Sequence, residues 1–163
     1  MLDEAILDQA ARTLAALRAQ GLTAVTAESC TGGLVAASLT HHAGSSDVVL
    51  GGFVTYSNAM KHRLLGVEMV LFDTVGAVSE AVAQAMAEGA LSHSGAGCAV
   101  SITGIAGPGG GSADKPVGLV WMATARAGAA TRAIHFVFPG NRAEIRSQAT
   151  AMALRLLAER AVG

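Results

Sequence analysis

Apolar residues recur every three to four positions between Leu2 and Gln20, at Ile6, Ala10, Leu14 and Leu17. This spacing places them on one face of an amphipathic helix, and Gly21 ends it. A second periodic pattern, formed by Ile145, Ala149, Met152 and Leu156, predicts a terminal helix from Arg142 to Arg160. Between them, Ser79 is a predicted N-cap for a third helix that ends near Ser94.

Short apolar runs between these helices predict strands. They cover Thr23 to Ala27, Val48 to Tyr56, Cys98 to Thr103, Gly118 to Ala125 and Thr131 to Phe138. The last two flank Gly128 and predict a hairpin, whereas Gly51 and Gly52 predict a bulge or a close backbone approach in the second strand. A short helix is expected from Leu34 to Thr40, and no helix or strand is predicted for the polar segment from Ser57 to Arg63.

The order of these elements predicts the fold class. Helices and strands alternate through the first hundred residues, and a hairpin and a helix follow. This order is typical of an α/β protein, here a three-layer α/β/α sandwich around a mixed sheet. The 163 residues suit one domain, expected to span residues 1–163.

Composition narrows the class of protein. Apolar residues make up 52% of the chain and charged residues 14%, which excludes intrinsic disorder. A net charge of −1 argues against the broad basic face of a nucleic-acid binder. The longest uncharged stretch, from Gly89 to Ala113, is too rich in Ser and Gly for a membrane span. With Asp3 and Glu4 opening the chain, no signal peptide is predicted, and a cytoplasmic location is expected.

Cysteine and lysine usage bears on chemistry. Cys30 and Cys98 have neither a disulfide framework nor a metal-ligand spacing, so reduced thiols and no bound metal are expected. Nine of the eleven basic residues are Arg, and Lys61 and Lys115 are the two Lys. A Lys retained in such a background can mark a position that needs an amine able to lose its proton.

Three polar clusters each follow a predicted strand. They run from Glu28 to Gly33, from Thr55 to Asn58 with Lys61, and from Thr103 to Gly110. Ligands bind outside the carboxyl ends of the strands in open α/β sheets, so these clusters are expected to converge on one site. The alternative is that the Ser, Thr and Gly residues only cap helices.

Acyl transfer is the chemistry that these residues suit best. Ser29, at a strand-to-helix turn, has backbone N–H groups nearby that can stabilise an oxyanion. The five histidines lie outside any nucleophile or zinc pattern, so Lys61 is the better base if burial lowers its pKa. Tyr56 could relay a proton or orient the amine, or merely cover a core edge. A Cys30 nucleophile is the rival, on the expectation that only one of two adjacent side chains faces the pocket.

The glycine-rich loop from Gly104 to Gly111 has the composition of a phosphate-binding loop but not the order of one. It lacks both the nucleoside-triphosphate and the dinucleotide glycine patterns. A nucleotide-dependent kinase or a dinucleotide enzyme is therefore not supported, and no cofactor is predicted.

Several motifs in order resemble the CinA C-terminal domain family. They are Ala27 to Gly33, Val54 to Asn58 with Lys61, Gly76 to Ser79, Thr103 to Pro108 and Lys115 to Gly118, within a resemblance from Leu14 to Leu157. The resemblance implies a nicotinamide-nucleotide amidase, in its stand-alone form, that works as a homodimer or higher homo-oligomer without a catalytic metal. It also implies Ser29 as nucleophile and Lys61 as base, supported by Tyr56 and Thr103.

The expected substrate is a small nucleotide, with neither nucleic acid nor membrane as partner. The residues expected to bind it are Cys30, Thr31, Gly32, Gly33, Asn58, Gly104, Gly107 and Arg142. The oxyanion is expected at N–H groups from Thr31 to Gly33 or at Gly104. The glycine loop, a helix N-terminus and Arg142 are the candidates for holding the phosphate. The alternative function is a noncatalytic nucleotide-sensing or competence and damage-inducible assembly domain.

Overall fold

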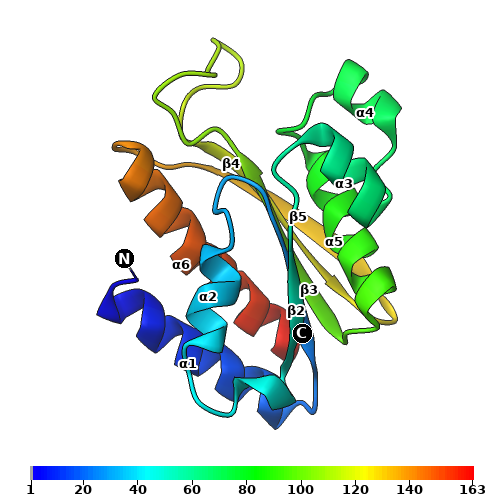
Figure 1. Ribbon diagram of the computed structural model, residues 1–163, viewed down its shortest axis with the longest axis vertical. Coiled ribbons are helices and arrows are strands. Elements are labelled where there is room, and N and C mark those ends of the chain that lie inside the picture. Colours follow the sequence, from blue (N-terminus) through cyan, green and yellow to red (C-terminus); the bar gives the residue numbers. More distant parts are fainter. Residues whose placement is uncertain (1) are drawn as a thin grey trace.

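The sheet determines where the polar clusters lie. In the computed structural model, which describes residues 2–163, five strands form one mixed sheet in the order β2-β1-β3-β4-β5 (Figure 1). Their bounds are β1 Ala24–Glu28, β2 Val49–Val54, β3 Cys98–Gly104, β4 Leu119–Arg126 and β5 Ala129–Val137. Strand β1 pairs in parallel with β2 and β3, and β3, β4 and β5 pair antiparallel. The carboxyl ends of β1, β2 and β3 therefore meet at one edge.

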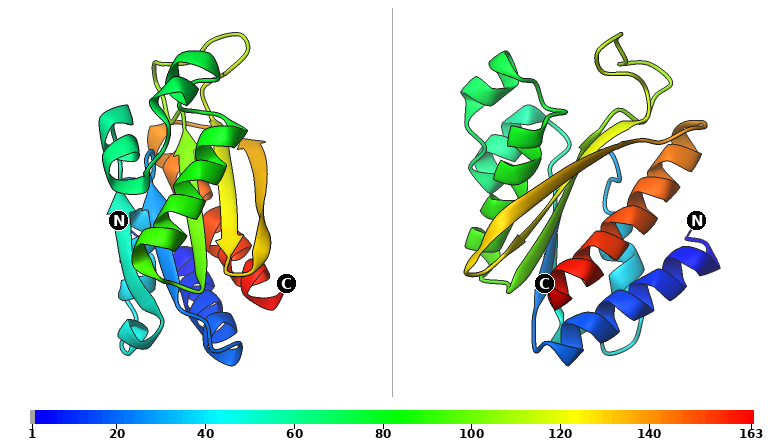
Figure 2. Two further views of the ribbon diagram at one scale, coloured as in Figure 1. Left: turned by 90° about the vertical axis from the view of Figure 1, so that its right-hand side faces the viewer. Right: turned by 180° about the vertical axis from the view of Figure 1, so that it is seen from behind.

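Helices cover both faces of the sheet (Figures 1 and 2). One layer holds α1 Glu4–Ala19, α2 Leu34–Thr40 and α6 Arg142–Val162, and the other holds α3 Asn58–Leu65, α4 Met69–Thr74 and α5 Glu80–Ser94. The predicted three-layer α/β/α sandwich around a mixed sheet is confirmed. The inner strand β1, between β2 and β3, is buried along its whole length because helices pack on both faces of the sheet.

Two apolar cores lie on opposite faces of the sheet. The first joins α1, α2 and α6 to the sheet through residues such as Leu14, Ile102 and Leu154. The second joins α5 to the other face through residues such as Met86 and Ala99. The first and last helices also contact each other directly, since Thr13 Oγ1 donates a hydrogen bond of 2.9 Å to the Leu154 carbonyl. The two ends of the described chain thus share one core.

The glycine pair in β2 combines both predicted features. The register shifts between the pairs Ala24 with Val49 and Val25 with Gly51, so the strand bulges there. A Cβ atom on Gly52 would lie 2.6 Å from Thr26 Oγ1 and 3.1 Å from Ala36 Cβ. Gly52 is therefore required by the close approach of β1 and α2.

Two helices lie where none was predicted. The segment from Ser57 to Arg63 is mostly helix α3, whose N-cap Ser57 accepts a hydrogen bond from the Met60 N–H. Helix α4 follows it and buries none of its residues. Neither helix carries the apolar stripe that the sequence analysis relied on. Strand β2 also ends at Val54, two residues earlier than predicted.

The part of the chain that the structure describes, residues 2–163, contains no helix with the length and apolar character needed to cross a membrane.

Candidate active site

The turn between β1 and α2 presents Ser29. The Ser29 N–H donates 2.9 Å to the Ile102 carbonyl of β3, which extends the parallel pairing by one residue. The chain then bends through Gly32 and Gly33, at φ angles of 60° and 97° that favour glycine. These two glycines allow α2 to begin directly behind the serine.

Glu28 holds this turn together from inside the protein. Its carboxylate is fully buried and accepts hydrogen bonds from the N–H groups of Gly33, Val35 and Ala36, at 2.9, 3.1 and 2.8 Å. The Thr26 hydroxyl adds a fourth bond of 3.1 Å. The residue before Ser29 therefore satisfies the free donors at the start of α2. No role was predicted for Glu28. A carboxylate directly before a strand-to-helix turn is the sequence signal that could have identified it as the acceptor for the free N–H groups of α2.

Lys61 reaches Ser29 from helix α3. Its Nζ lies 3.0 Å from Ser29 Oγ and donates to the Thr55 carbonyl at 2.9 Å. The side chain is only 2% exposed, and burial lowers the pKa of Lys61 to about 8. About one amine in ten is then neutral at pH 7. Because one N–H of the Lys61 amine donates to the Thr55 carbonyl, the lone pair of the neutral amine can face the Ser29 hydroxyl.

A cavity of about 260 Å³ opens over this pair. Of the predicted site residues, it brings together Ser29, Cys30, Tyr56, Asn58, Lys61, Thr103, Gly104 and Arg142. Ala77, Val78 and Ala106 complete the lining. The three polar clusters therefore converge on one cavity. Thr31, Gly32, Gly33 and Gly107 do not line it.

Arg142 links the two sides of the cavity mouth. One terminal nitrogen donates 2.8 Å to the Gly107 carbonyl and the other donates 2.8 Å to the Tyr56 hydroxyl. Tyr56 is 62% exposed, so its ring stands at the rim. The phenol is oriented by Arg142 at the rim, whereas Lys61 and Ser29 bond to each other inside.

Thr103 lies at the end of β3 and is 1% exposed. Its hydroxyl donates 2.8 Å to the Ala77 carbonyl. This bond fixes the segment before α5 against the sheet, and Ala77 and Val78 of that segment line the cavity. Thr103 therefore positions one wall of the site.

Two of the N–H groups expected to bind the oxyanion, those of Gly32 and Gly33, have other hydrogen-bond partners. The Gly32 N–H already donates to the Ser29 carbonyl, and the Gly33 N–H donates to Glu28. Gly104 lies opposite Val120 of β4, but the neighbouring pair of Ile105 and Leu119 is the hydrogen-bonded one, so the Gly104 N–H faces β1 and not β4. Within residues 2–163, the N–H groups of Cys30 and Thr31 have no acceptor. These two N–H groups and that of Gly104, which lines the cavity, are therefore the candidate donors for the oxyanion.

Arg146 orients this part of the turn from helix α6. It donates to the carbonyls of Cys30 and Thr31, at 3.0 and 3.1 Å. In a trans peptide the N–H points opposite to the carbonyl, so the Thr31 N–H points away from Arg146. The sequence analysis missed Arg146, because nothing in the sequence distinguishes it from the other arginines of the helix.

Residue Cys30 also lines the cavity, and its side chain belongs to the apolar core shared with α1, α2 and α6. The Cys30 residue is 5% exposed, and burial raises the pKa of its thiol to about 11. The thiol is therefore protonated near neutral pH, and a thiol is a far weaker nucleophile than a thiolate. Of these two neighbours, Ser29 is the one whose side chain contacts Lys61.

The titratable residues do not gather into a metal site. Over residues 2–163, no group of three or more His, Cys, Asp and Glu side chains could hold a metal ion. His42, His62 and His93 each contact a backbone carbonyl, of Leu7, Val67 and Gly89 respectively. None of these three histidines lines the Ser29 cavity.

Comparison with known proteins shows the family. Residues 7–161 match the sequence profile of the CinA C-terminal domain. The "Nicotinamide-nucleotide amidohydrolase PncC" of Enterobacter agglomerans is 50% identical over 141 residues, which cover 86% of each chain. A "CinA-like protein" of Mycolicibacterium vanbaalenii is 54% identical over 150 residues, 92% of this chain and 34% of that protein. This chain thus spans about a third of the length of such CinA-like relatives.

Solved structures agree with this assignment. The competence/damage inducible protein CihA of Agrobacterium tumefaciens has a TM-score of 0.94 and 46% identity, covering 98% of this chain and 97% of that one. A CinA superfamily protein of Klebsiella pneumoniae has a TM-score of 0.92 and 36% identity, with 96% and 98% covered. The chain belongs to the CinA C-terminal domain family.

Proposed function

We propose that this protein hydrolyses the carboxamide of nicotinamide mononucleotide to nicotinic acid mononucleotide and ammonia. The observation that carries the proposal is the 3.0 Å contact between Lys61 Nζ and Ser29 Oγ, with an amine pKa of about 8. A buried amine beside a hydroxyl is the arrangement of a serine and lysine hydrolase. The amidohydrolase name of the Enterobacter agglomerans relative supports the same substrate.

The first half of the reaction makes an acyl-enzyme. Neutral Lys61 removes the Ser29 proton, and the Ser29 oxygen forms a bond to the carboxamide carbon. The N–H groups of Cys30 and Thr31, or that of Gly104, stabilise the oxyanion. The tetrahedral intermediate then collapses by breaking the carbon–nitrogen bond, and Lys61 returns its proton to the leaving nitrogen, which departs as ammonia.

Water completes the cycle by the same path. Lys61 takes a proton from water, the resulting oxygen attacks the ester carbon, and the bond to Ser29 breaks. The proton returns to the Ser29 oxygen, and the carboxylic acid product leaves. No metal or cofactor takes part in this proposal, and the dyad supplies both the nucleophile and the base.

The rim of the cavity provides the expected charge for the substrate phosphate. Arg142 places two terminal nitrogens at the mouth, and a guanidinium binds phosphate through paired hydrogen bonds. Binding of phosphate there would compete with the Tyr56 hydroxyl for the same nitrogen. Tyr56 and Asn58 then contact the sugar or ring. The proposal also includes a small nucleotide as the substrate, a cytoplasmic location and a homo-oligomeric protein.

The test is release of ammonia from nicotinamide mononucleotide by the purified protein. Wild type is expected to release one ammonia for each nicotinic acid mononucleotide, and Ser29→Ala to release none while it still binds the substrate. Ser29→Ala purified in parallel also controls for contaminating amidases. Binding without ammonia release by wild type would instead identify a nucleotide-sensing domain.

A further inference from the structure

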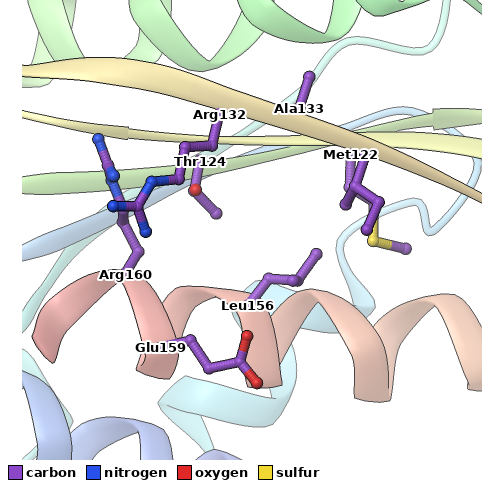
Figure 3. Close-up of a pocket in the computed structure, with 8 residues that line it drawn as sticks. Met122, Thr124, Arg132, Ala133, Leu156, Glu159 and Arg160 are labelled. Carbon is purple, nitrogen blue, oxygen red and sulfur yellow. The ribbon is translucent and has the colours of Figure 1, made fainter. Parts of the chain in front are cut away.

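A second cavity lies between the β4–β5 hairpin and helix α6, and none of its lining residues belongs to the Ser29 cavity (Figure 3). Its volume is about 260 Å³. Pockets for drug-sized ligands are commonly ~300–1,000 Å³, so this one suits a smaller molecule. One part of its wall is cationic and the other is apolar, and each part constrains the ligand separately.

Arg160 provides the cationic part of the wall. Its residue is 2% exposed, and one terminal nitrogen donates to the Ala130 carbonyl. Within residues 2–163, its buried Nε has no hydrogen-bond partner. A guanidinium carries five N–H donors, and a buried cation is unfavourable unless an acceptor or counter-charge compensates it.

Neighbouring positive charges make the uncompensated charge of Arg160 still less favourable. Burial and the neighbouring positive charges of Arg132 and Arg126 lower the pKa of Arg160, in that order of importance. Arg132 donates to the Gly163 carbonyl, and Arg126 donates to the carbonyls of Arg160 and Ala161. These hydrogen bonds of the three guanidinium groups thus go to main-chain oxygens and not to an acidic side chain.

The carboxylate that lines the cavity does not neutralise these groups. Glu159 lies 2.8 Å from Arg155 Nε, an exposed partner four residues earlier on α6. Figure 3 shows the Glu159 carboxylate on the helix side, turned away from the guanidinium groups of Arg132 and Arg160. The cationic end of the cavity therefore lacks a counter-ion from the described residues that line it.

The remaining wall is aliphatic. Met122 is fully buried under the hairpin, Leu156 faces it from α6, and Ile134 of the edge strand is 45% exposed. We propose that this cavity is a second ligand site, for a small carboxylate with an aliphatic body. The carboxylate binds Arg160 and Arg132 through paired N–H donors, and the body packs against Met122, Leu156 and Ile134.

Methyl NMR of the full chain tests this site with hexanoate as the probe. The methyl signals of Met122 and Ile134 report on the second cavity, and those of Val78 report on the Ser29 cavity. Hexanoate is expected to shift Met122 and Ile134 to saturation without moving Val78. Hexanamide, which lacks the charge, and inorganic phosphate, which lacks the aliphatic body, are expected to bind at least about tenfold more weakly.

Two arginine variants separate the site from a general charge effect. Arg132→Gln is expected to weaken hexanoate binding at least about fivefold. Arg63→Gln removes an exposed charge from α3 on the other side of the sheet and is expected to leave the affinity unchanged. Arg160→Lys is a further variant, and Arg132→Gln still decides the question if that protein does not fold. Ser29→Ala is expected to bind hexanoate like wild type, so this result is independent of the amidase proposal.

Several results would overturn the proposal. They are the absence of saturation at Met122 and Ile134, equal affinity for hexanamide or phosphate, and equal affinity of the Arg132→Gln and Arg63→Gln proteins. Methyl signals of Met122 and Ile134 that change with protein concentration and not with hexanoate concentration would indicate that a second copy of the chain binds at this cavity. That result would also overturn the proposal.

Discussion

Lys61 is an amine in the protein interior, and its pKa determines what it can do. A general base must be neutral to accept a proton, and a pKa of about 8 makes the neutral form available near physiological pH. Arginine in the same place would keep its charge at every accessible pH. The identity of this side chain therefore matters more than its charge.

We accordingly expect Lys61→Arg to lose about 10²- to 10⁴-fold in kcat, nearly as much as Lys61→Ala, as is typical for removal of a general base. Steady-state kinetics with nicotinamide mononucleotide measure this. If Lys61→Arg kept kcat and raised only KM, Lys61 would be a phosphate ligand, and Tyr56 would become the candidate base.

The pH dependence of kcat/KM follows from the same pKa. The amine is protonated and inactive below about pH 8, so kcat/KM is expected to rise about tenfold per pH unit at acidic pH and to level off above a pKa near 8. A profile on the free enzyme between pH 5.5 and 9.5 measures it. A flat profile across pH 7 to 9 would contradict a lysine base.

Burial of this amine also costs stability. Unfolding returns the pKa of Lys61 from about 8 to its model-peptide value of 10.5, so between these values the unfolded chain binds more protons, and stability rises with pH. Below pH 8 the full cost applies, about 3 kcal/mol. Lys61→Met is expected to be inactive but more stable than wild type at pH 7, by up to that amount. Urea denaturation at pH 7 and pH 10.5 would show the difference shrinking at the higher pH, whereas a constant difference would contradict the shifted pKa.

Ser29 and Cys30 provide a matched pair on the same turn. Ser29→Ala is expected to abolish turnover, and Cys30→Ala to keep it within about tenfold, because the Cys30 thiol only packs in the core. Turnover and substrate affinity of both variants give the comparison. An active Ser29→Ala beside an inactive Cys30→Ala would reverse the assignment of the nucleophile.

At the scale of elements, helix α2 depends on a side chain outside it. Glu28→Gln replaces a carboxylate that accepts three N–H bonds, so we expect a loss of about 2–3 kcal/mol and a lower kcat as the Ser29 turn moves. Glu80→Gln is the matched control, since that exposed carboxylate lies in the first turn of α5. Thermal unfolding and kcat of both variants test the idea, and equal losses of stability would refute it.

The elements that the sequence predicted best are those with an apolar stripe. Helices α1, α5 and α6 were predicted to within two or three residues of their ends, because each buries one apolar face. Helix α3 buries Lys61 and Leu65, and α4 buries nothing, so no stripe marked them. Burial of a lysine is an exception to the apolar pattern, and hydrophobic periodicity cannot anticipate it.

At the scale of the whole molecule, the convergence of the polar clusters was predictable because parallel strands end at one edge. The contacts between this edge of the sheet and helix α6 were not predictable from the sequence. Arg142 and Arg146 reach the site from more than a hundred residues away along the chain from Ser29. Apart from the Tyr56 hydroxyl, their partners are backbone carbonyls that any sequence presents. Such contacts depend on packing and leave no local pattern.

At this scale we also expect that chelators leave the proposed amidase activity unchanged. Residues 2–163 offer no cluster of metal-ligating side chains, so dialysis against EDTA is expected to leave amidase activity unchanged. Activity before and after dialysis, with and without added zinc or magnesium, measures this. Loss on dialysis and recovery with either ion would contradict the metal-free mechanism.

The contact between the first and last helices has a consequence during synthesis. Helix α1 packs against α6, and the 122 residues between them require roughly 6–24 s of translation at about 5–20 residues per second. Throughout that interval the apolar face of α1, with Leu14 and Leu17, lacks its contact with α6, although α2 and the strands of the same core emerge earlier. The part of α1 that packs on α6 therefore stays available to chaperones until synthesis is nearly complete, and the core on this face of the sheet closes only when α6 emerges.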